Sequence, residues 1–330
     1  MPQTMKAWFS VPGPEGAVFE LREAAVPSPG PGQVLVAIRA AGVNRGELIR
    51  GAQARSGPSA QPTRAGGEFA GEIAALGEGV TGWKPGDRVM GRAAGSYAAY
   101  VAASPRVLMR IPDGMAWSEA AAIPNVYVTA HDALVTNAAA ASGESVMVTA
   151  ASSGVGTAAL QIARYIGATP VLATTRSSTK GAALRALGAQ EVIDTSDPGW
   201  VEAVRRATGG RGVDVIIDHV GGPLLAGNIE VLALKGRLVS VGRTGTWVGD
   251  CNLDEVARKR LRIIGVTFRT RTPEESLECS ERFARHLLPA VAKGDLKPVL
   301  DRTFPFDRLT DAHRYMLSDA QIGKIVLVAA

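Results

Sequence analysis

A turn of small residues in the middle of the chain could bind a phosphate group. The apolar run at residues 146–150 leads into ASSGVG at 151–156, and a helical pattern follows at once. Small residues let the backbone approach a phosphate, and the first turn of a helix offers N–H groups at the positive end of its dipole. Only Gly156 matches the strict pattern G-x-G-x-x-G, because Ala151 and Ser153 stand where glycines are expected. The same letters could form an ordinary tight turn, so the surrounding elements must decide.

The next apolar stretch ends in a segment that carries positive charge and no acid. Dinucleotide sites that select NAD usually place Asp or Glu here to bind the ribose 2′-hydroxyl. This chain instead has TTRSSTK at 174–180. Arg176, Ser177 and Lys180 could bind a 2′-phosphate, and charge-assisted hydrogen bonds contribute about 1.5–3 kcal/mol each. We therefore expect NADPH as the cofactor; the alternative is that both cations are simply solvated at a helix start.

Strand and helix patterns alternate from Glu144 onward. Apolar stretches such as TPVLATT and VDVIIDHV are separated by helical stretches such as TAALQIARYIG and PLLAGNIEVLAL. This alternation predicts an α/β fold with a doubly wound parallel sheet of the Rossmann type, covered by helices on both faces. LRIIGVTF at 261–268 is expected to add a further strand, and an amphipathic helix follows it.

The two ends of the chain differ from this central region. The pattern of residues 1–110 predicts short strands between Gly and Pro turns. An alanine-rich helical run is expected from Ser118, past Pro124, to about Ala141. The final stretch, GKIVLVAA, is expected to be a strand that returns to the first domain. A chain of 330 residues is long for one core, so we expect two domains.

The composition excludes several classes of protein. The chain is 46% hydrophobic and 20% charged, and its net charge of +5 is dispersed along the sequence, so we do not expect nucleic-acid binding. Cys251 and Cys279 are too few for a disulfide framework and fit a reducing compartment. The N-terminal segment lacks a signal-peptide pattern, and no stretch is apolar enough to span a membrane. We expect a cytoplasmic protein with no membrane partner.

Taken together, the motifs resemble those of the zinc-free quinone oxidoreductase, or zeta-crystallin-like, branch of the medium-chain dehydrogenase/reductase superfamily. The resemblance covers nearly the whole chain through AAGVNRGELIRG, GGEFAGEIAALGEGVTGWKPGDRVMG, GSYAAYV, VYVTAHDAL, ASSGVGTAALQIA, KRLRIIGVTFRTRTPEE and IGKIVLV, in this order. It implies a Rossmann NADPH-binding domain at 125–289, inserted into a GroES-like, β-rich substrate domain made of 1–124 and 290–330. It also implies a homodimer through the Rossmann domains, with LRIIGVTF as the expected edge contact unless the chain's own helix covers it.

The resemblance also implies which residues form the site. Asn44 is expected at the nicotinamide end as a candidate catalytic residue; Tyr127 and Tyr97 are further candidates, although both could be packing residues. The remaining cofactor-binding candidates are Thr129, Ser152, Ser153, Gly154, Val155, Arg176, Ser177, Lys180, Val220, Gly242, Arg243, Phe268, Arg269 and Lys324. One departure puts the substrate assignment in doubt. The branch often has a Tyr a few residues after the Asn, and here that segment reads RGEL at 45–48.

Zinc is not expected. Zinc alcohol dehydrogenases of the same superfamily carry Cys and His ligands at positions that are Asn44 and Gly67 in this chain. A catalytic zinc needs three protein ligands from Cys, His or carboxylate. The four histidines lack the spacing of a metal site, and two cysteines cannot form a four-cysteine structural site. We therefore expect no bound metal.

Without a Lewis acid, acceptors that take up hydride readily are favoured. We expect direct hydride transfer from NADPH to a quinone or a similar electron-poor acceptor, with the protein mainly orienting the reactants. A first alternative is an NADPH-dependent reductase of α,β-unsaturated carbonyls, such as enones or enoyl thioesters. A second is a non-catalytic NADPH-binding protein. The loops at 51–65 and 247–254 are expected to line the substrate pocket.

Overall fold

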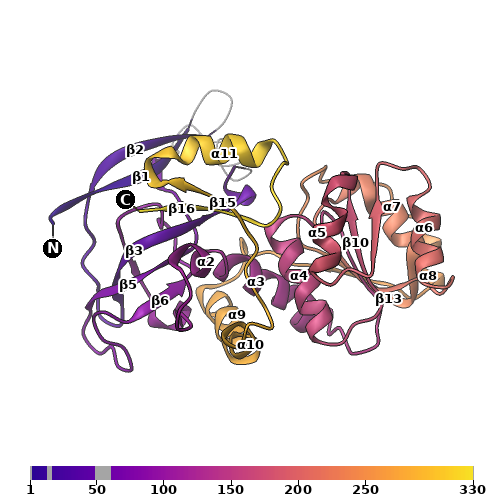
Figure 1. Cartoon of the computed structure of the whole chain (residues 1–330), viewed down its shortest axis with the longest axis horizontal. Coiled ribbons are helices and arrows are strands. Elements are labelled where there is room, and N and C mark those ends of the chain that lie inside the picture. Colours follow the sequence, from indigo (N-terminus) through magenta and orange to yellow (C-terminus); the bar gives the residue numbers. More distant parts are fainter. Residues whose placement is uncertain (1, 13–16, 49–60, 330) are drawn as a thin grey trace. The chain divides into compact units, whose positions relative to one another are not determined.

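The structure, a computed structural model, describes residues 2–12, 17–48 and 61–329. The chain divides into two compact units (Figure 1). Unit 1 consists of Met1–Val126, Ser280–Ala292 and Lys297–Ala330, and unit 2 consists of Tyr127–Cys279 and Lys293–Leu296. Most of the predicted pocket loop at 51–65 lies outside the described residues.

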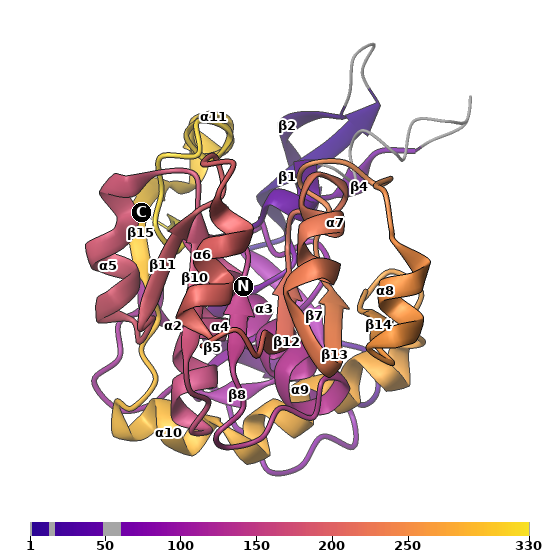
Figure 2. The ribbon, with the colours of Figure 1, turned by 90° about the vertical axis from the view of Figure 1, so that its right-hand side faces the viewer.

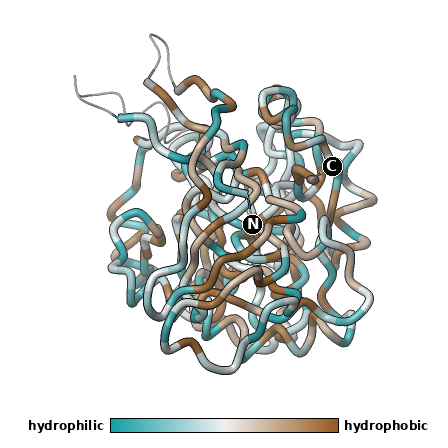
Figure 3. Tube along the Cα trace, turned by 90° about the vertical axis from the view of Figure 1, so that its left-hand side faces the viewer, coloured by the Kyte–Doolittle hydropathy of each residue, from teal (hydrophilic) through white to brown (hydrophobic). Residues whose placement is uncertain are grey.

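Unit 1 is built mainly of strands. They are β1 (Thr4–Pro12), β2 (Ala17–Ala25), β3 (Val34–Val43), β4 (Thr63–Arg64), β5 (Phe69–Leu76), β6 (Arg88–Gly91), β7 (Tyr100–Ala103), β8 (Met109–Arg110), β15 (Leu300–Pro305) and β16 (Lys324–Val328). One sheet has the order β2-β1-β4, and the other has the order β15-β16-β3-β5-β6-β8, with β7 also paired to β3. In Figure 3 the tube alternates between brown hydrophobic and teal hydrophilic stretches, as expected for sheets with one buried face.

The larger sheet of unit 1 brings distant parts of the chain to one end of its central strands. β16 pairs antiparallel with β3, and Ile325 lies opposite Val43. β5 pairs antiparallel with β3 on the other side, and its first residue, Phe69, lies opposite Ala41. Asn44, Glu68 and Lys324 are therefore neighbours, because each lies at or beside this end of its strand. The last strand of the chain returns to the first domain, as the sequence predicts.

Unit 2 contains a single parallel sheet. Its strands are β9 (Val146–Val148), β10 (Val171–Thr175), β11 (Glu191–Asp194), β12 (Val213–Asp218), β13 (Leu232–Ser240) and β14 (Arg262–Gly265). Their order, β11-β10-β9-β12-β13-β14, is that of a doubly wound sheet whose strand order reverses beside β9. All three side chains of β9 are buried although they point alternately to opposite faces, so both faces are covered (Figure 2). The predicted fold class is confirmed.

The helices begin and end where capping and proline chemistry allow. They are η1 (Pro105–Val107), α2 (Trp117–Ala121), α3 (Pro124–His131), the π-helix η2 (Asp132–Asn137), α4 (Gly154–Tyr165), η3 (Ser178–Lys180), α5 (Gly181–Ala186), α6 (Trp200–Ala207), α7 (Gly222–Val231), α8 (Leu253–Arg258), α9 (Pro273–His286), α10 (Leu288–Lys293), η4 (Phe306–Arg308) and α11 (Leu309–Leu317). No helix among the residues described above is long and apolar enough to cross a membrane.

Two predicted helices differ from the observed ones. The predicted run from Ser118 to Ala141 is divided into α2, α3 and η2. α3 begins at Pro124, because proline lacks an N–H group and is tolerated only in the first turn of a helix. The predicted helix PLLAGNIEVLAL ends early, and β13 begins at Leu232. A short apolar run does not distinguish a buried helix from a buried strand, and here the sheet takes up its last residues.

Candidate functional site

The phosphate turn of unit 2 has the geometry that the sequence predicts. α4 begins at Gly154, and the Ser153 Oγ accepts a hydrogen bond from the Gly156 N–H at 3.1 Å. A Cβ on Gly156 would lie 2.6 Å from the Ala151 carbonyl oxygen, so only glycine lets the helix start pack this closely on the turn. The first N–H groups of a helix have no intrahelical partners, which suits an anion.

The cationic turn after β10 lies beside this phosphate turn. Lys180 Nζ donates a hydrogen bond to Ser152 Oγ at 3.4 Å, which brings together two segments that were predicted separately. Ser177 N–H donates to Thr175 Oγ1 at 3.1 Å, and Arg176 is exposed. Residues 174–180 include no acidic side chain. A basic and hydroxyl-rich surface therefore adjoins the start of α4.

The end of β12 presents a buried histidine beside the end of β9. Asp218 Oδ1 accepts a hydrogen bond from Thr149 Oγ1 at 2.8 Å, and His219 Nδ1 lies 2.9 Å from the Thr149 carbonyl oxygen. A carbonyl can only accept, so Nδ1 carries the proton and Nε2 is left as an acceptor. Burial lowers the pKa of His219, which keeps the ring neutral. Its Nε2 is buried without a hydrogen-bond partner among the described residues.

The loop after β13 closes on the same strand end. Gly242 N–H donates to the Asp218 carbonyl at 3.0 Å, and Gly245 N–H donates to the Val220 carbonyl at 2.9 Å. A Cβ on Gly242 would lie 2.8 Å from the His219 carbonyl oxygen, so this close approach requires glycine. Val220, Gly242 and Arg243 are thus placed at the carboxyl edge of the sheet, where doubly wound folds bind ligands.

The other candidates in unit 2 have more varied surroundings. Tyr127 is buried in α3; its hydroxyl accepts a hydrogen bond from Gln161 Nε2 at 3.0 Å, and burial raises its pKa. Thr129, on the same helix, is also buried. After β14, the guanidinium of Arg271 lies 4.7 Å from the centre of the Phe268 ring, and Arg269 N–H donates to Thr267 Oγ1 at 3.2 Å.

Unit 1 holds a buried network centred on Lys324. Its Nζ donates hydrogen bonds to Glu68 Oε1 at 2.7 Å, Asn44 Oδ1 at 2.9 Å and the Val43 carbonyl at 2.7 Å. An ammonium group has three donors, so all of them are used. Asn125 contributes two further bonds, from its backbone N–H to Glu68 Oε2 at 2.7 Å and from its Nδ2 to Asn44 Oδ1 at 2.9 Å. The Asn44 side chain is therefore fixed in one orientation.

Two more groups extend this network. Glu47 Oε1 lies 3.2 Å from Asn44 Nδ2, and Glu47 Oε2 lies 2.5 Å from the hydroxyl of Tyr97. Desolvation raises the pKa of Glu47 to about 7, although hydrogen bonds from Tyr97 and Asn44 and the charge of Lys324 act in the opposite direction. Burial, with Glu47 nearby, raises the pKa of Tyr97 well above its ordinary value. We refer to Asn44, Glu47, Glu68, Tyr97, Asn125 and Lys324 as the acid–amide network.

Sequence reasoning identified Asn44, Tyr97 and Lys324 but missed the functional potential of Glu47, Glu68 and Asn125. Glu47 stood in the segment that was noted only for lacking a tyrosine. A signal for Glu68 was its position immediately before a buried strand, where an acidic residue needs a partner. No local pattern indicates Asn125, which follows Pro124 at the start of α3.

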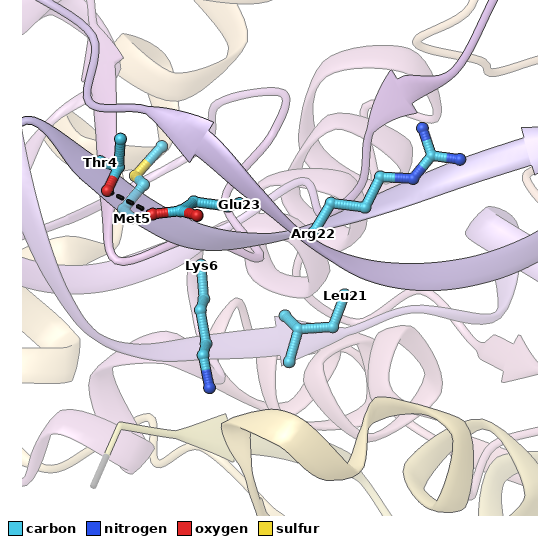
Figure 4. Close-up of a pocket in the computed structure, with 6 residues that line it drawn as sticks. All are labelled: Thr4, Met5, Lys6, Leu21, Arg22 and Glu23. Carbon is cyan, nitrogen blue, oxygen red and sulfur yellow. Dashed lines mark hydrogen bonds between the residues drawn. The ribbon is translucent and has the colours of Figure 1, made fainter.

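A surface hollow on the three-stranded sheet is lined by Thr4, Met5, Lys6, Leu21, Arg22 and Glu23 (Figure 4). The Thr4 hydroxyl donates to Glu23 at 2.6 Å, and Arg22 pairs with Glu20 at 2.7 Å, which is ordinary surface chemistry. Within the described ranges, no group of three or more His, Cys, Asp or Glu residues is arranged to hold a metal ion.

Comparisons with known proteins agree over the whole chain. Models of the alcohol dehydrogenase GroES-like domain and of the zinc-binding dehydrogenase match residues 30–113 and 187–327, respectively. A Homo sapiens quinone oxidoreductase is 33% identical over 324 residues, which is 97% of this chain and 96% of the relative. A solved NAD-dependent alcohol dehydrogenase has a TM-score of 0.89 and 31% identity, with 99% of this chain and 100% of that chain covered. The CurK enoyl reductase has a TM-score of 0.85 and 27% identity, with 100% of both chains covered.

Proposed function

Because this chain belongs to the quinone oxidoreductase branch of the medium-chain dehydrogenase/reductase superfamily, we propose that it reduces a quinone, or a similar electron-poor small molecule, with NADPH and without a metal. The resemblance inferred from the sequence is confirmed, and the chain is an oxidoreductase. The single observation that carries the choice of cofactor is the contact between Lys180 and Ser152, which joins a cationic turn to a phosphate turn.

The residues of unit 2 fit a nicotinamide dinucleotide. Ser152, Ser153, Gly154 and Val155 would hold the pyrophosphate at the start of α4, and Arg176, Ser177 and Lys180 would bind the 2′-phosphate. The unpartnered Nε2 of His219 and the close packing at Gly242 support a ligand at the same edge of the sheet. Thr129, Val220, Arg243, Phe268 and Arg269 remain proposed contacts. When bound, the cofactor would supply the hydride.

In unit 1, Asn44 is the proposed contact to the nicotinamide and acceptor end. Its amide is held by Lys324, Glu68 and Asn125, so it is preorganised rather than mobile. Because Lys324 uses its three donors within the network, we assign it the role of positioning Asn44 at the cofactor end. The hydroxyl of Tyr127 is bonded to Gln161, which makes it the weaker of the two catalytic candidates.

A second candidate function is reduction of a carbon–carbon double bond conjugated to a carbonyl. The structural similarity to the CurK enoyl reductase over the whole chain favours it. The cofactor site would be the same, and only the acceptor would differ. The non-catalytic alternative is disfavoured, since the family is one of enzymes. Cys251 and Cys279 form no disulfide in the part of the chain that the structure describes, which fits the proposed cytoplasmic location.

We also propose a homodimer through the edge strand of unit 2. β14 is the last strand in the sheet order, and the side chain of Ile263 on this strand is half exposed. Trp247, Val248 and Leu253 add further exposed apolar surface in the same unit. An open apolar edge of this kind favours pairing across a two-fold axis.

The function is tested with a panel of acceptors and purified protein. NADPH oxidation is followed with benzoquinone, naphthoquinone, an alkenal and an enoyl thioester. Turnover with the quinones supports the first function, and turnover with only the alkenal or the thioester supports the second. Binding of NADPH without oxidation by any acceptor would contradict both.

A further inference from the structure

The acid–amide network contains two carboxyl groups and only one cation. Lys324 and Glu68 form an ion pair at 2.7 Å, with side chains 4% and 0% exposed, respectively. Every donor of the Lys324 ammonium is directed to Glu68, Asn44 or the Val43 carbonyl, and none to Glu47. An ionised Glu47 would therefore leave one uncompensated negative charge in a largely buried cluster, which is strongly unfavourable.

The hydrogen bonds around Tyr97 indicate the same protonation state. The Tyr97 hydroxyl lies 3.1 Å from the Gly42 carbonyl oxygen and 2.5 Å from Glu47 Oε2. A phenol has one hydrogen, and the carbonyl can only accept. If Glu47 carries a proton on Oε2, it donates to Tyr97 while Tyr97 donates to Gly42, and all three oxygens are satisfied. If Glu47 is ionised, Tyr97 donates to Glu47, and the Gly42 carbonyl keeps the longer contact from Asn44 Nδ2 at 3.3 Å.

Glu47 lies at the less buried end of the acid–amide network. Glu47 is only partly buried, whereas Tyr97 is completely buried. The backbone of Gly67 lies beside the Glu47 carboxyl group, and a Cβ built on this glycine would lie 3.7 Å from Glu47 Oε1. Its other neighbour is the amide of Asn44, the proposed contact to the acceptor. Glu47 thus ends a hydrogen-bonded chain from Gly42 through Tyr97, next to the Asn44 amide.

We propose that Glu47 is the general acid of the reaction, donating its proton to the acceptor as the acceptor is reduced, with Tyr97 and Asn44 as positioning residues. This inference rests on the proposed function. The acceptor gains two electrons and one hydrogen as hydride from the reduced dinucleotide, which becomes oxidised. The Glu47 O–H bond breaks as an O–H bond forms on the reduced quinone, or on the enolate oxygen of a reduced enone. Water then returns a proton to the carboxylate.

The test compares Glu47→Gln and Glu47→Asp with Glu72→Gln, a control that removes a surface carboxylate paired with Arg39 in the same unit. Glutamine keeps the size of the side chain and an oxygen for Tyr97 but has no acidic proton. We expect kcat of Glu47→Gln to fall roughly 100-fold, the usual scale of general-acid catalysis, with NADPH affinity unchanged. Wild-type kcat should fall as pH rises through about 7, because the carboxyl group loses its proton; the ionisable groups that face it are Lys324, Glu68 and Tyr97. The fall should be absent from Glu47→Gln and retained by Glu47→Asp.

An infrared measurement on the cofactor-free protein provides a readout that does not depend on turnover. Wild type should show the C=O stretch of a protonated buried carboxyl group on the acid side of about pH 7, and Glu47→Gln should lack this band. Absence of the band in wild type, or an unchanged kcat and pH profile in Glu47→Gln, would overturn the assignment and leave the proposed function intact. No turnover by wild type with any acceptor would overturn the proposed function, and the role of Glu47 with it.

Discussion

The ion pair between Lys324 and Glu68 gives the sharpest test of how the acid–amide network is held together. Lys324→Met keeps the approximate length of the side chain but removes its charge and three hydrogen bonds. Lys324 is 3% exposed and Glu68 is fully buried, so the Glu68 carboxylate would remain without a counter-ion. Breaking a buried pair in this way costs about 3–5 kcal/mol. We expect the free energy of unfolding to fall by about 4 kcal/mol.

The assay is urea denaturation followed by circular dichroism, with Glu68→Gln and the double variant completing a cycle. Glutamine at 68 keeps an oxygen for the Asn125 N–H but removes the charge that Lys324→Met leaves unpaired. The double variant should therefore lose about 1–3 kcal/mol less stability than the sum of the losses of the two single variants, within the range of coupling between contacting residues. Lys6→Met, at an exposed lysine of β1, should change stability by less than about 0.5 kcal/mol. A loss below about 1 kcal/mol for Lys324→Met, or strict additivity in the cycle, would refute this reasoning.

Three further predictions concern stability, cofactor binding and assembly. The pKa of Glu47 is raised in the folded chain, so its contribution to stability is full below its ordinary pKa of 4.5 and is lost as pH rises through about 7. At most about 3–4 kcal/mol is lost across this interval, so the stability of wild type relative to Glu47→Gln should decrease as pH rises through it; a pH dependence of unfolding midpoints that is the same in both proteins would contradict the prediction. Gly156→Ala should weaken NADPH binding in a fluorescence titration and cost about 1–3 kcal/mol, because its Cβ meets backbone atoms, whereas Gly181→Ala, whose Cβ would meet only a methyl group at 4.0 Å, should do neither. Ile263→Asp should shift the protein from dimer to monomer in sedimentation velocity, whereas Val18→Asp in unit 1 should leave it a dimer; equal behaviour would argue against β14 as the interface.

The parts of the fold that depend on a repeated pattern were predictable from the sequence. The order strand, phosphate turn, helix at 146–165 follows from local chemistry: small residues at a turn, a serine that caps the helix, and a glycine where the backbones meet. The cationic end of β10 was predictable for the same reason. The predicted end of the helix PLLAGNIEVLAL was wrong for a reason that is also local. The apolar run continues past Leu232, but the helix ends before it and a strand begins. Hydrophobic periodicity alone does not decide such a boundary.

The acid–amide network could not be assembled from the sequence. Glu68 and Lys324 are separated by 256 positions and become neighbours only because β5 and β16 pair with opposite edges of β3. The protonation of Glu47 depends on how many cations share the cluster, which no spacing rule reveals. Asn44 and Lys324 were identified through family resemblance, and the structure supplies the physical reason for their proximity.

The central claim, reduction of an electron-poor acceptor with NADPH, is tested most directly by the ratio of kcat/KM for NADPH to that for NADH. The ratio is measured with one quinone, in wild type and in the double variant Arg176→Ala, Lys180→Ala. Each charge-assisted bond to a 2′-phosphate contributes about 1.5–3 kcal/mol, and every 1.4 kcal/mol is about tenfold. Wild type should therefore prefer NADPH by at least about 100-fold, and the double variant should lose most of this preference while keeping its rate with NADH. Equal kcat/KM with both cofactors in wild type would contradict the account.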